Sequence, residues 1–148
     1  MSRMSDLRYL LIDGHSIIHA WPELRRVHLQ AARRHLAREQ LLQRLRHYQD
    51  MTGERVIVVF DGTQSRTTEE REDGGLQIFY ADAGKTADSI IERLVAKYAA
   101  LHPMRAATAD GMIRETVSAF GGHWISPETL RTICDEAEGD MRRRIGRG

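Results

Sequence analysis

The 148-residue sequence lacks the features of several protein classes. It has no apolar run near the roughly 18 residues that a transmembrane helix needs, so we expect a soluble protein without membrane contacts. The polar N-terminus from Met1 to Leu7 indicates neither a secretory signal nor a transit peptide, which favours a cytoplasmic location. Because Cys134 is the single cysteine, the chain can form neither an internal disulfide nor a zinc site of thiolates. We expect Cys134 to be a packed helix residue in a reducing compartment.

Lysine is also scarce, since only Lys85 and Lys97 contribute to the 22 basic residues that balance 21 acidic ones. The positive charge is therefore almost entirely arginine, and much of it falls into two groups. One group lies between residues 21 and 48 and the other in a basic tail from about residue 140: Arg25, Arg26, Arg33, Arg34, Arg38, Arg44 and Arg46, then Arg142, Arg143, Arg144 and Arg147. Guanidinium groups bind phosphate through two oxygens at once. A solvated helix face or a frayed tail is the alternative for any one arginine.

The pattern of apolar residues predicts a single α/β domain over residues 1–148. Short apolar runs predict strands at 8–13, 55–60, 76–80, 104–108 and 123–125, and the polar stretch 63–75 predicts a loop. Helical spacing and capping residues predict helices over 31–51, from Thr86 to Pro103, from Asp110 to Phe120, and from Ser126 onward. Strands that alternate with helices and are apolar on both faces form a parallel sheet covered on both sides. We therefore predict a three-layer fold with a five-stranded parallel sheet.

Four aspartates follow the predicted strands. Asp13, Asp61 and Asp110 stand at or just after strand ends, and Asp88 lies in the first turn of the helix after the third strand. The carboxyl ends of parallel strands share one edge, where such sheets bind ligands. Carboxylates brought together there repel one another unless a proton or a cation neutralises them. Oxygen ligands suit Mg²⁺ or Mn²⁺, and two ions roughly 4 Å apart can catalyse phosphodiester hydrolysis. The pattern predicts a metal-dependent nuclease.

Each aspartate also has an ordinary structural interpretation. Asp-Gly after a strand is a common turn, and the helix dipole alone favours Asp88 in a first turn. Glu92 lies one helical turn beyond Asp88, so it can join the site or only hydrate the surface. His15 and His19 can share a helix face as zinc ligands do, but no third ligand accompanies them. A P-loop ending at Thr86 is excluded because the motif needs glycine where Phe79 stands.

Several phrases of the sequence resemble a known family. They are Leu11-Ile-Asp-Gly-His-Ser-Ile-Ile18, Ala20-Trp-Pro-Glu-Leu24, Ala37-Arg38, Tyr48 with Thr52-Gly53, Val56 to Asp61, Thr86-Ala-Asp-Ser-Ile-Ile-Glu-Arg-Leu94 and Ala107-Thr-Ala-Asp110. In this order, from about Arg8 to Leu130, the chain resembles the YacP-like NYN-domain ribonucleases of the PIN-like nuclease superfamily. The resemblance implies strand order 3-2-1-4-5, a Mg²⁺ or Mn²⁺ site and endonucleolytic cleavage of RNA. Some relatives act on messenger RNA at the ribosome, so the ribosome is a candidate partner.

The resemblance also implies roles for individual residues. The four aspartates would be metal ligands or position the attacking water, with Glu92 as a further candidate ligand: Asp13, Asp61, Asp88 and Asp110. Ser16 and Thr108 lie in matched phrases, where we expect RNA contacts. The family often has tyrosine and asparagine where His15 and Ser16 stand, and often has serine at Ala109. These changes remove no carboxylate, but they affect the expected rate and metal preference.

The arginines indicate where RNA would bind. A helix that follows a parallel strand begins near the carboxyl edge of the sheet, which brings Arg33, Arg34 and Arg38 to the acidic end. Arg34 and Arg38 also continue the line of the apolar stripe, so these turns would overhang the core and face a cleft. Binding of a phosphate backbone by such residues would be salt-sensitive and largely independent of sequence.

Two other functions compete with a nuclease. The first is a catalytically degenerate RNA-binding or ribosome-associated adaptor, which the altered positions His15 and Ser16 favour. The second is a phosphoacceptor receiver domain, which gathers aspartates in a similar fold but needs a lysine at the end of the last strand. Neither Lys85 nor Lys97 is there. The sequence leaves the oligomeric state open.

Overall fold

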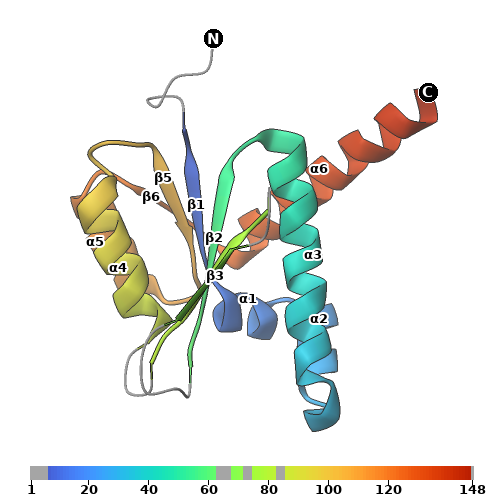
Figure 1. The fold of residues 1–148 in the computed structure, drawn as a ribbon, viewed down its shortest axis with the longest axis horizontal. Coiled ribbons are helices and arrows are strands. Elements are labelled where there is room, and N and C mark those ends of the chain that lie inside the picture. Colours follow the sequence, from blue (N-terminus) through green and yellow to red (C-terminus); the bar gives the residue numbers. More distant parts are fainter. Residues whose placement is uncertain (1–6, 63–67, 72–74, 83–85, 148) are drawn as a thin grey trace.

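A six-stranded sheet lies between two layers of helices (Figure 1). The computed structural model describes residues 7–62, 68–71, 75–82 and 86–147. The strands are β1 (Tyr9–Asp13), β2 (Arg55–Phe60), β3 (Thr68–Arg71), β4 (Gln77–Tyr80), β5 (Met104–Ala107) and β6 (His123–Ile125). Their order across the sheet is β3-β4-β2-β1-β5-β6. The five strands from β4 to β6 are parallel and have the predicted order, which confirms the α/β fold.

The sixth strand corrects one prediction. Residues 63–75 were expected to form a loop, but Thr68–Arg71 forms β3, which pairs antiparallel with β4. The segment Thr-Glu-Glu-Arg has no apolar residue, so neither a run nor an alternation marks it as a strand. Charged residues are nevertheless common on edge strands, where they discourage further strand pairing. The rest of the predicted loop, apart from Gly75, lies outside the described residues.

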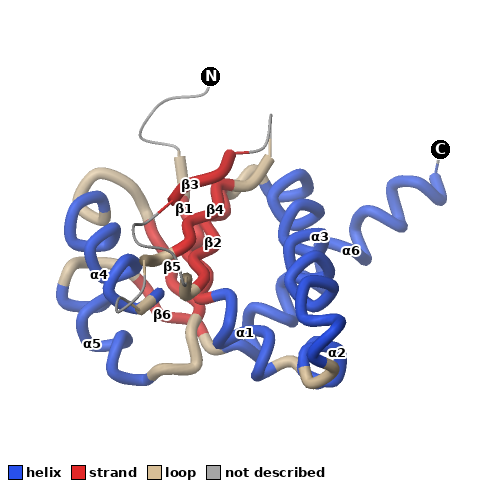
Figure 2. Tube along the Cα trace, turned by 60° about the horizontal axis from the view of Figure 1, so that its bottom comes forward, coloured by secondary structure: helices blue, strands red, loops and turns tan. Residues whose placement is uncertain are grey.

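Among the described residues, seven helical segments connect and flank the strands. They are α1 (Gly14–Ala20), α2 (Pro22–His28), the 3₁₀ turn η2 (Ala31–Arg33), α3 (Arg34–Thr52), α4 (Ala87–Tyr98), α5 (Gly111–Ala119) and α6 (Pro127–Arg147). Helices α4 and α5 cover one face of the sheet, and α1, α2, α3 and α6 lie on the other (Figures 1 and 2). Two apolar clusters fill the spaces between the layers. In the described part of the chain, no helix is long and apolar enough to cross a membrane.

Sequence signals explain where several helices begin and end. The Asp13 carboxylate accepts a hydrogen bond from the backbone N–H of Ser16 and so caps α1. Thr86 caps α4 in the same way through Ser89, and Asp110 caps α5 through Met112. Helix α3 ends at Gly53, which has a positive φ of 75°. Two of the candidate site residues therefore also begin helices.

Helix α6 is anchored to the body through α3. The Arg44 side chain reaches Glu138 and Asp135 of α6, with its Nε 2.7 Å from Glu138 Oε1, and it lies over the Trp21 ring. The Trp21 indole, only 1% exposed, donates a hydrogen bond to the Pro127 carbonyl at 2.9 Å. Arg44 is therefore a packing residue rather than a free phosphate ligand.

The C-terminal segment also differs from the sequence prediction. Helix α6 continues through the basic tail to residue 147, so this region is a helix that extends away from the body (Figure 1). The alternative of a frayed tail is wrong. Cys134 is buried in α6, as predicted.

Candidate metal centre

The four aspartates meet at the carboxyl edge of the parallel strands, the lower edge of the sheet in Figure 1. Asp13 ends β1, Asp61 follows β2, Asp110 follows β5 and begins α5, and Asp88 lies in the first turn of α4. Strands β2 and β5 both pair with β1 in parallel register, so their carboxyl ends flank Asp13. The convergence thus follows from the topology of the sheet.

Glycines after two of these aspartates let the chain pack closely at this edge. A Cβ atom at Gly14 would stand 2.2 Å from Phe60 Cε1, and one at Gly62 would stand 1.8 Å from the carbonyl oxygen of Ala81. A side chain at Gly14 would displace the Phe60 ring of β2. A side chain at Gly62 would displace the backbone at Ala81, directly after β4. The Asp-Gly pairs therefore have a packing role beyond that of an ordinary turn.

Asp13 is the most enclosed carboxylate, with 8% of the residue exposed. Its Oδ1 accepts the Ser16 N–H at 3.3 Å, and its Oδ2 accepts the Thr108 hydroxyl at 3.2 Å. Burial nevertheless raises the pKa of Asp13 above its ordinary value, and the charge of Asp61 adds to this effect. The two hydrogen-bond donors thus fix the orientation of the carboxylate, but they do not fully offset the effect of burial on its pKa.

Asp88 lies close enough to Asp110 and Asp13 for both carboxylates to affect its pKa. Burial, followed by these two carboxylates, raises the pKa of Asp88 to about 8. Its Oδ1 is buried and has no hydrogen-bond partner among the described residues. Because Asp13 and Asp110 donate no hydrogen bond when ionised, Asp88 needs either a proton or a cation at this position.

Asp110 and Asp61 form the exposed side of the cluster. Asp110 accepts the Met112 N–H at 2.9 Å, and this bond, with that from Asp88, holds the pKa of Asp110 below its ordinary value. The Asp61 side chain is 52% exposed, and its Oδ1 accepts the Ala87 N–H at 2.7 Å. Asp61 thereby fixes the start of α4 directly before Asp88.

Polar side chains from α1 and the segment after β5 hold the cluster together. The Thr108 hydroxyl contacts Asp13 and accepts the Asp110 N–H at 3.1 Å, and the Ser16 hydroxyl accepts the Ala109 N–H at 2.5 Å. Thr108 is completely buried. The Thr108 side chain is therefore directed inward, toward Asp13 and Asp110, and its expected contact with RNA stays a prediction.

Comparison with known proteins agrees with this arrangement. The profile of the YacP-like NYN domain matches residues 10–147, nearly the whole chain. The chain belongs to the YacP-like NYN domain family. Over 90 residues it is 39% identical to the YacP protein of Bacillus subtilis strain 168, a match that covers 57% of this chain and 49% of that protein. The match therefore spans about half the length of this curated relative.

Solved structures from the same family share the fold. The crystal structure of Rae1 (YacP) from Bacillus subtilis, as its W164L mutant, superimposes with a TM-score of 0.79 at 30% identity, covering 94% of this chain and 81% of that one. A second crystal structure of Rae1 (YacP) gives a TM-score of 0.77 at 28% identity, with 94% and 80% covered. The NYN domain has a nuclease-like fold, in agreement with the fold predicted from the sequence.

The donor set of this NYN domain suits a hard divalent cation. All the converging groups are carboxylate oxygens, and the buried Asp88 Oδ1 has no donor among the described residues. In the described part of the chain, no group of three or more His, Cys, Asp or Glu side chains is arranged so that it could hold a metal ion. Mg²⁺ commonly uses only one or two carboxylates and completes its shell with waters and substrate phosphates. The binding of Mg²⁺ or Mn²⁺ at this edge stays a prediction.

Glu92 is not brought into the cluster by any contact with a described residue. It is half-buried on α4, one turn beyond Asp88, and no hydrogen bond or ion pair joins it to the described aspartates. Its role as a metal ligand therefore stays a prediction. Asp88 interacts electrostatically with two other members of the cluster and lies in the first turn of α4.

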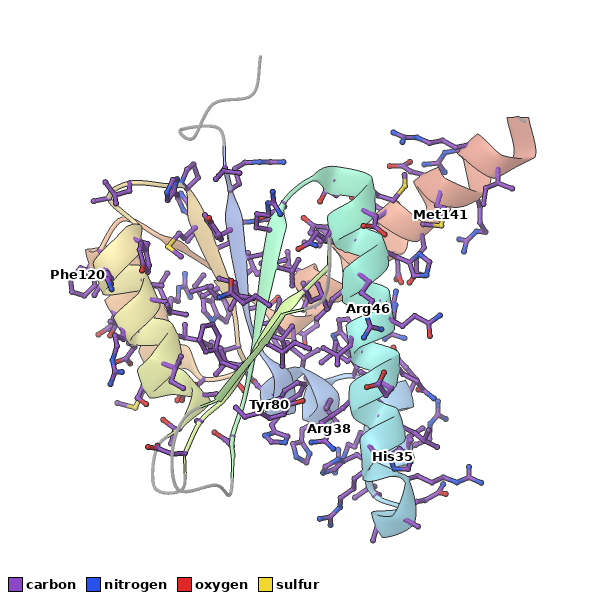
Figure 3. The ribbon with its side chains drawn as sticks, in the orientation of Figure 1. His35, Arg38, Arg46, Tyr80, Phe120 and Met141 are labelled. Carbon is purple, nitrogen blue, oxygen red and sulfur yellow. The ribbon has the colours of Figure 1, made fainter. Side chains whose placement is uncertain are left out.

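The predicted RNA-binding arginines lie at the same end of the NYN domain as the aspartates. Arg33 and Arg34 are exposed at the start of α3, and Arg38 is half-buried one turn later. Figure 3 shows Arg38 at the lower end of α3, at the same end of the molecule as Tyr80, the last residue of β4. The placement predicted for these arginines agrees with the structure, while RNA binding itself stays a prediction.

The structure adds residues that the motifs did not indicate. His15 Nδ1 lies 3.5 Å from Asp61 Oδ2, and the His15 ring packs edge-on against Phe60. Phe60 in turn stacks on Tyr80 at 5.7 Å between ring centroids. Both aromatic residues end their strands, so their position at the site edge could be predicted from the strand boundaries. The contact of His15 with Asp61 depends on the path of α1 and has no signal in the sequence.

Proposed function

We propose that the chain is a divalent-metal-dependent endoribonuclease that hydrolyses RNA phosphodiester bonds in the cytoplasm, in messenger RNA decay or RNA processing. The observation that carries this proposal is the half-buried Asp88 carboxylate, which lies beside two other carboxylates and has a buried oxygen without a donor among the described residues. Such a group needs either a proton or a cation, and it stands at the ligand-binding edge of a nuclease-like fold. Membership of the NYN family supports the same conclusion.

Each aspartate of the site would have its own role in hydrolysis. When bound, Mg²⁺ or Mn²⁺ lowers the pKa of a water and offsets negative charge on the phosphate. Asp13 would hold the cation most rigidly, because Ser16 and Thr108 fix its two oxygens. Asp88 and Asp110 would complete one side of the site, and the more exposed Asp61 would face the substrate. The water oxygen bonds to phosphorus as the bond to the 3′-oxygen breaks, which leaves a 3′-hydroxyl and a 5′-phosphate.

The arginines at the start of α3 support RNA as the substrate. In the described structure, no carboxylate forms an ion pair with Arg33, Arg34 or Arg38, whereas Arg44 and Arg46 pair with acidic residues. Cationic groups without an internal partner are available to the phosphates of a polynucleotide. Affinity for RNA would then fall steeply as the salt concentration rises.

Cleavage of a labelled single-stranded RNA tests this function directly. Purified protein is incubated with Mn²⁺, with Mg²⁺ or with a chelator, alongside Asp13→Asn and Asp61→Asn variants. We expect cleavage with metal, none in chelator, and a loss of about 100-fold or more in each variant. A Glu128→Gln variant, at an exposed position in the first turn of α6, is the matched control and should cleave like the wild type. Cleavage that persists in chelator or in both aspartate variants would refute the proposal.

A non-catalytic RNA-binding or ribosome-associated adaptor is the second candidate. The position of His15 favours it, because this ring accepts the Asp61 N–H at 3.4 Å and lies 3.5 Å from the Asp61 carboxylate, where it occupies space beside a group that would bind the cation. An adaptor would bind RNA or ribosomes equally well with and without the aspartates and would cleave nothing with either metal. The cleavage assay above, combined with RNA-binding measurements on the same variants, separates the two functions.

A further inference from the structure

A group of basic side chains adjoins the acidic cluster on the α1–α3 side. We call it the histidine–arginine patch: His15 and His19 of α1, His28 of α2, and Arg34 and Arg38 of α3. Helix α1 packs against both α2 and α3, which brings these three elements together next to β1 (Figure 2). His15 contacts Asp61, so the patch begins at the edge of the candidate metal centre.

The centre of the patch is a pair of imidazoles. The His19 and His28 rings are 4.8 Å apart between centroids and nearly perpendicular. The Nδ1 atom of His28 is buried and has no hydrogen-bond partner among the described residues. His19 is exposed, so one ring of the pair faces solvent while the other is partly enclosed. A buried nitrogen without a partner is unfavourable unless a ligand or a water completes its hydrogen bonding.

Four groups that can carry positive charge act on His28. Burial, and then the positive charges of His19, Arg34, His15 and Arg38, lower the pKa of the His28 imidazole. Within the described residues, Asp61 is the one acidic group in ion-pair contact with the patch, and it faces His15. Five groups that carry or can acquire positive charge thus lie together with one carboxylate at their border. An anion bound among them would relieve this repulsion.

We propose that His19 and His28, together with Arg34 and Arg38, bind a backbone phosphate of the RNA strand as it leaves the metal centre. This inference rests on the proposed function and specifies the path of its substrate. A phosphate carries several acceptor oxygens and can take hydrogen bonds from an imidazolium and from a guanidinium fork at once. His15 joins the patch to Asp61, and this contact is the basis for placing the patch on the path of a strand held at the aspartates.

This subsite should make RNA binding depend on pH. A neutral imidazole contributes little charge, whereas a protonated one donates to phosphate and attracts it. Because its neighbours disfavour the proton on His28, the free protein gains this charge only as the pH falls, and a bound phosphate stabilises it. Affinity for RNA should therefore rise as the pH falls from about 8 to about 5.5. The rise should be larger than in a variant that lacks both His19 and His28.

Fluorescence anisotropy with labelled oligouridine in chelator tests the proposal, because cleavage is then absent. We expect wild-type affinity to increase about tenfold between the two pH values, and the double variant His19→Gln/His28→Gln to lose most of this increase. A His123→Gln variant, at an exposed position on the edge strand β6, is the matched control and should behave like the wild type. Thermal melting of each variant confirms that it is folded.

Two outcomes would overturn the inference. One is an unchanged pH dependence in the double variant, and the other is an equal loss in the His123 control. The result is separable from that of the proposed function. If the wild type cleaves RNA with Mn²⁺ but the double variant binds like the wild type, the subsite is wrong and the nuclease stands. If the pair controls binding but no protein cleaves, the nuclease is wrong and the subsite stands.

Discussion

Replacing Arg105 by methionine should destabilise the protein by about 3 kcal/mol. Arg105 on β5 donates two hydrogen bonds to the Glu54 carboxylate, from Nη2 at 2.6 Å and from Nε at 3.2 Å. The Tyr48 hydroxyl donates to the same carboxylate at 2.5 Å. The Glu54 side chain is only 3% exposed. Without the guanidinium, its charge is buried and uncompensated, which typically costs about 3–5 kcal/mol. Because the Arg105 side chain is 32% exposed, solvent screens part of this effect. We therefore expect a destabilisation at the lower end of this range, about 3 kcal/mol.

Urea unfolding at about pH 8 measures this loss. Adding Glu54→Leu should recover most of the stability, because an apolar pair can replace a buried ion pair. Arg131→Met is the matched control, since Arg131 pairs with Glu23 at 3.0 Å but is 45% exposed, and it should cost less than about 1 kcal/mol. Similar losses for both arginine variants would refute the reasoning.

Three further predictions follow from individual contacts. Trp21→Phe leaves the Pro127 carbonyl without its buried donor and should lower the free energy of unfolding by about 1–3 kcal/mol in urea titrations. An unchanged free energy of unfolding would contradict this, since water would then replace the indole as the donor. Burial raises the pKa values of Cys134 and Tyr48 to about 12, so the folded state holds these protons more tightly than the unfolded chain. The melting temperature should therefore decline as the pH rises from about 9 to about 12, and a flat profile would contradict this origin. Asp88→Asn removes one of three crowded carboxylates, so in chelator it should stabilise the protein by about 1 kcal/mol, and a lower melting temperature would contradict the repulsion. With Mn²⁺ present, the same variant should lose cleavage.

Much of the fold could be predicted because its strongest local signals agree with its topology. The segments Leu10–Ile12 and Val56–Phe60 are apolar throughout, as expected for central parallel strands covered on both faces. Once these strands are parallel, Asp13 and Asp61 must lie at the same edge. The position of Asp110 follows from the same argument. Asp88 also joined this edge, because the helix after β4 begins there.

Other features depend on packing that no local pattern specifies. Helices α1 and α2 are only seven residues long each, too short for a clear periodicity, and their separation at Trp21 depends on the indole that fills the core. The Thr108 side chain points inward, where its hydroxyl donates to Asp13 and accepts the Asp110 N–H. A position next to a strand end does not predict this orientation. The contact between His19 and His28 likewise exists only because α1 packs against α2.

The binding of a divalent cation by the four aspartates is the central claim, and paramagnetic broadening by Mn²⁺ tests it most directly. In a titration of isotopically labelled protein, amide signals at Gly14, Gly62, Ser89 and Gly111 should broaden first, because each follows one of the aspartates. Asp13→Asn should shift this broadening to higher Mn²⁺ concentration without unfolding the protein. Broadening that starts elsewhere, or that is the same in the Asp13 variant, would contradict the account.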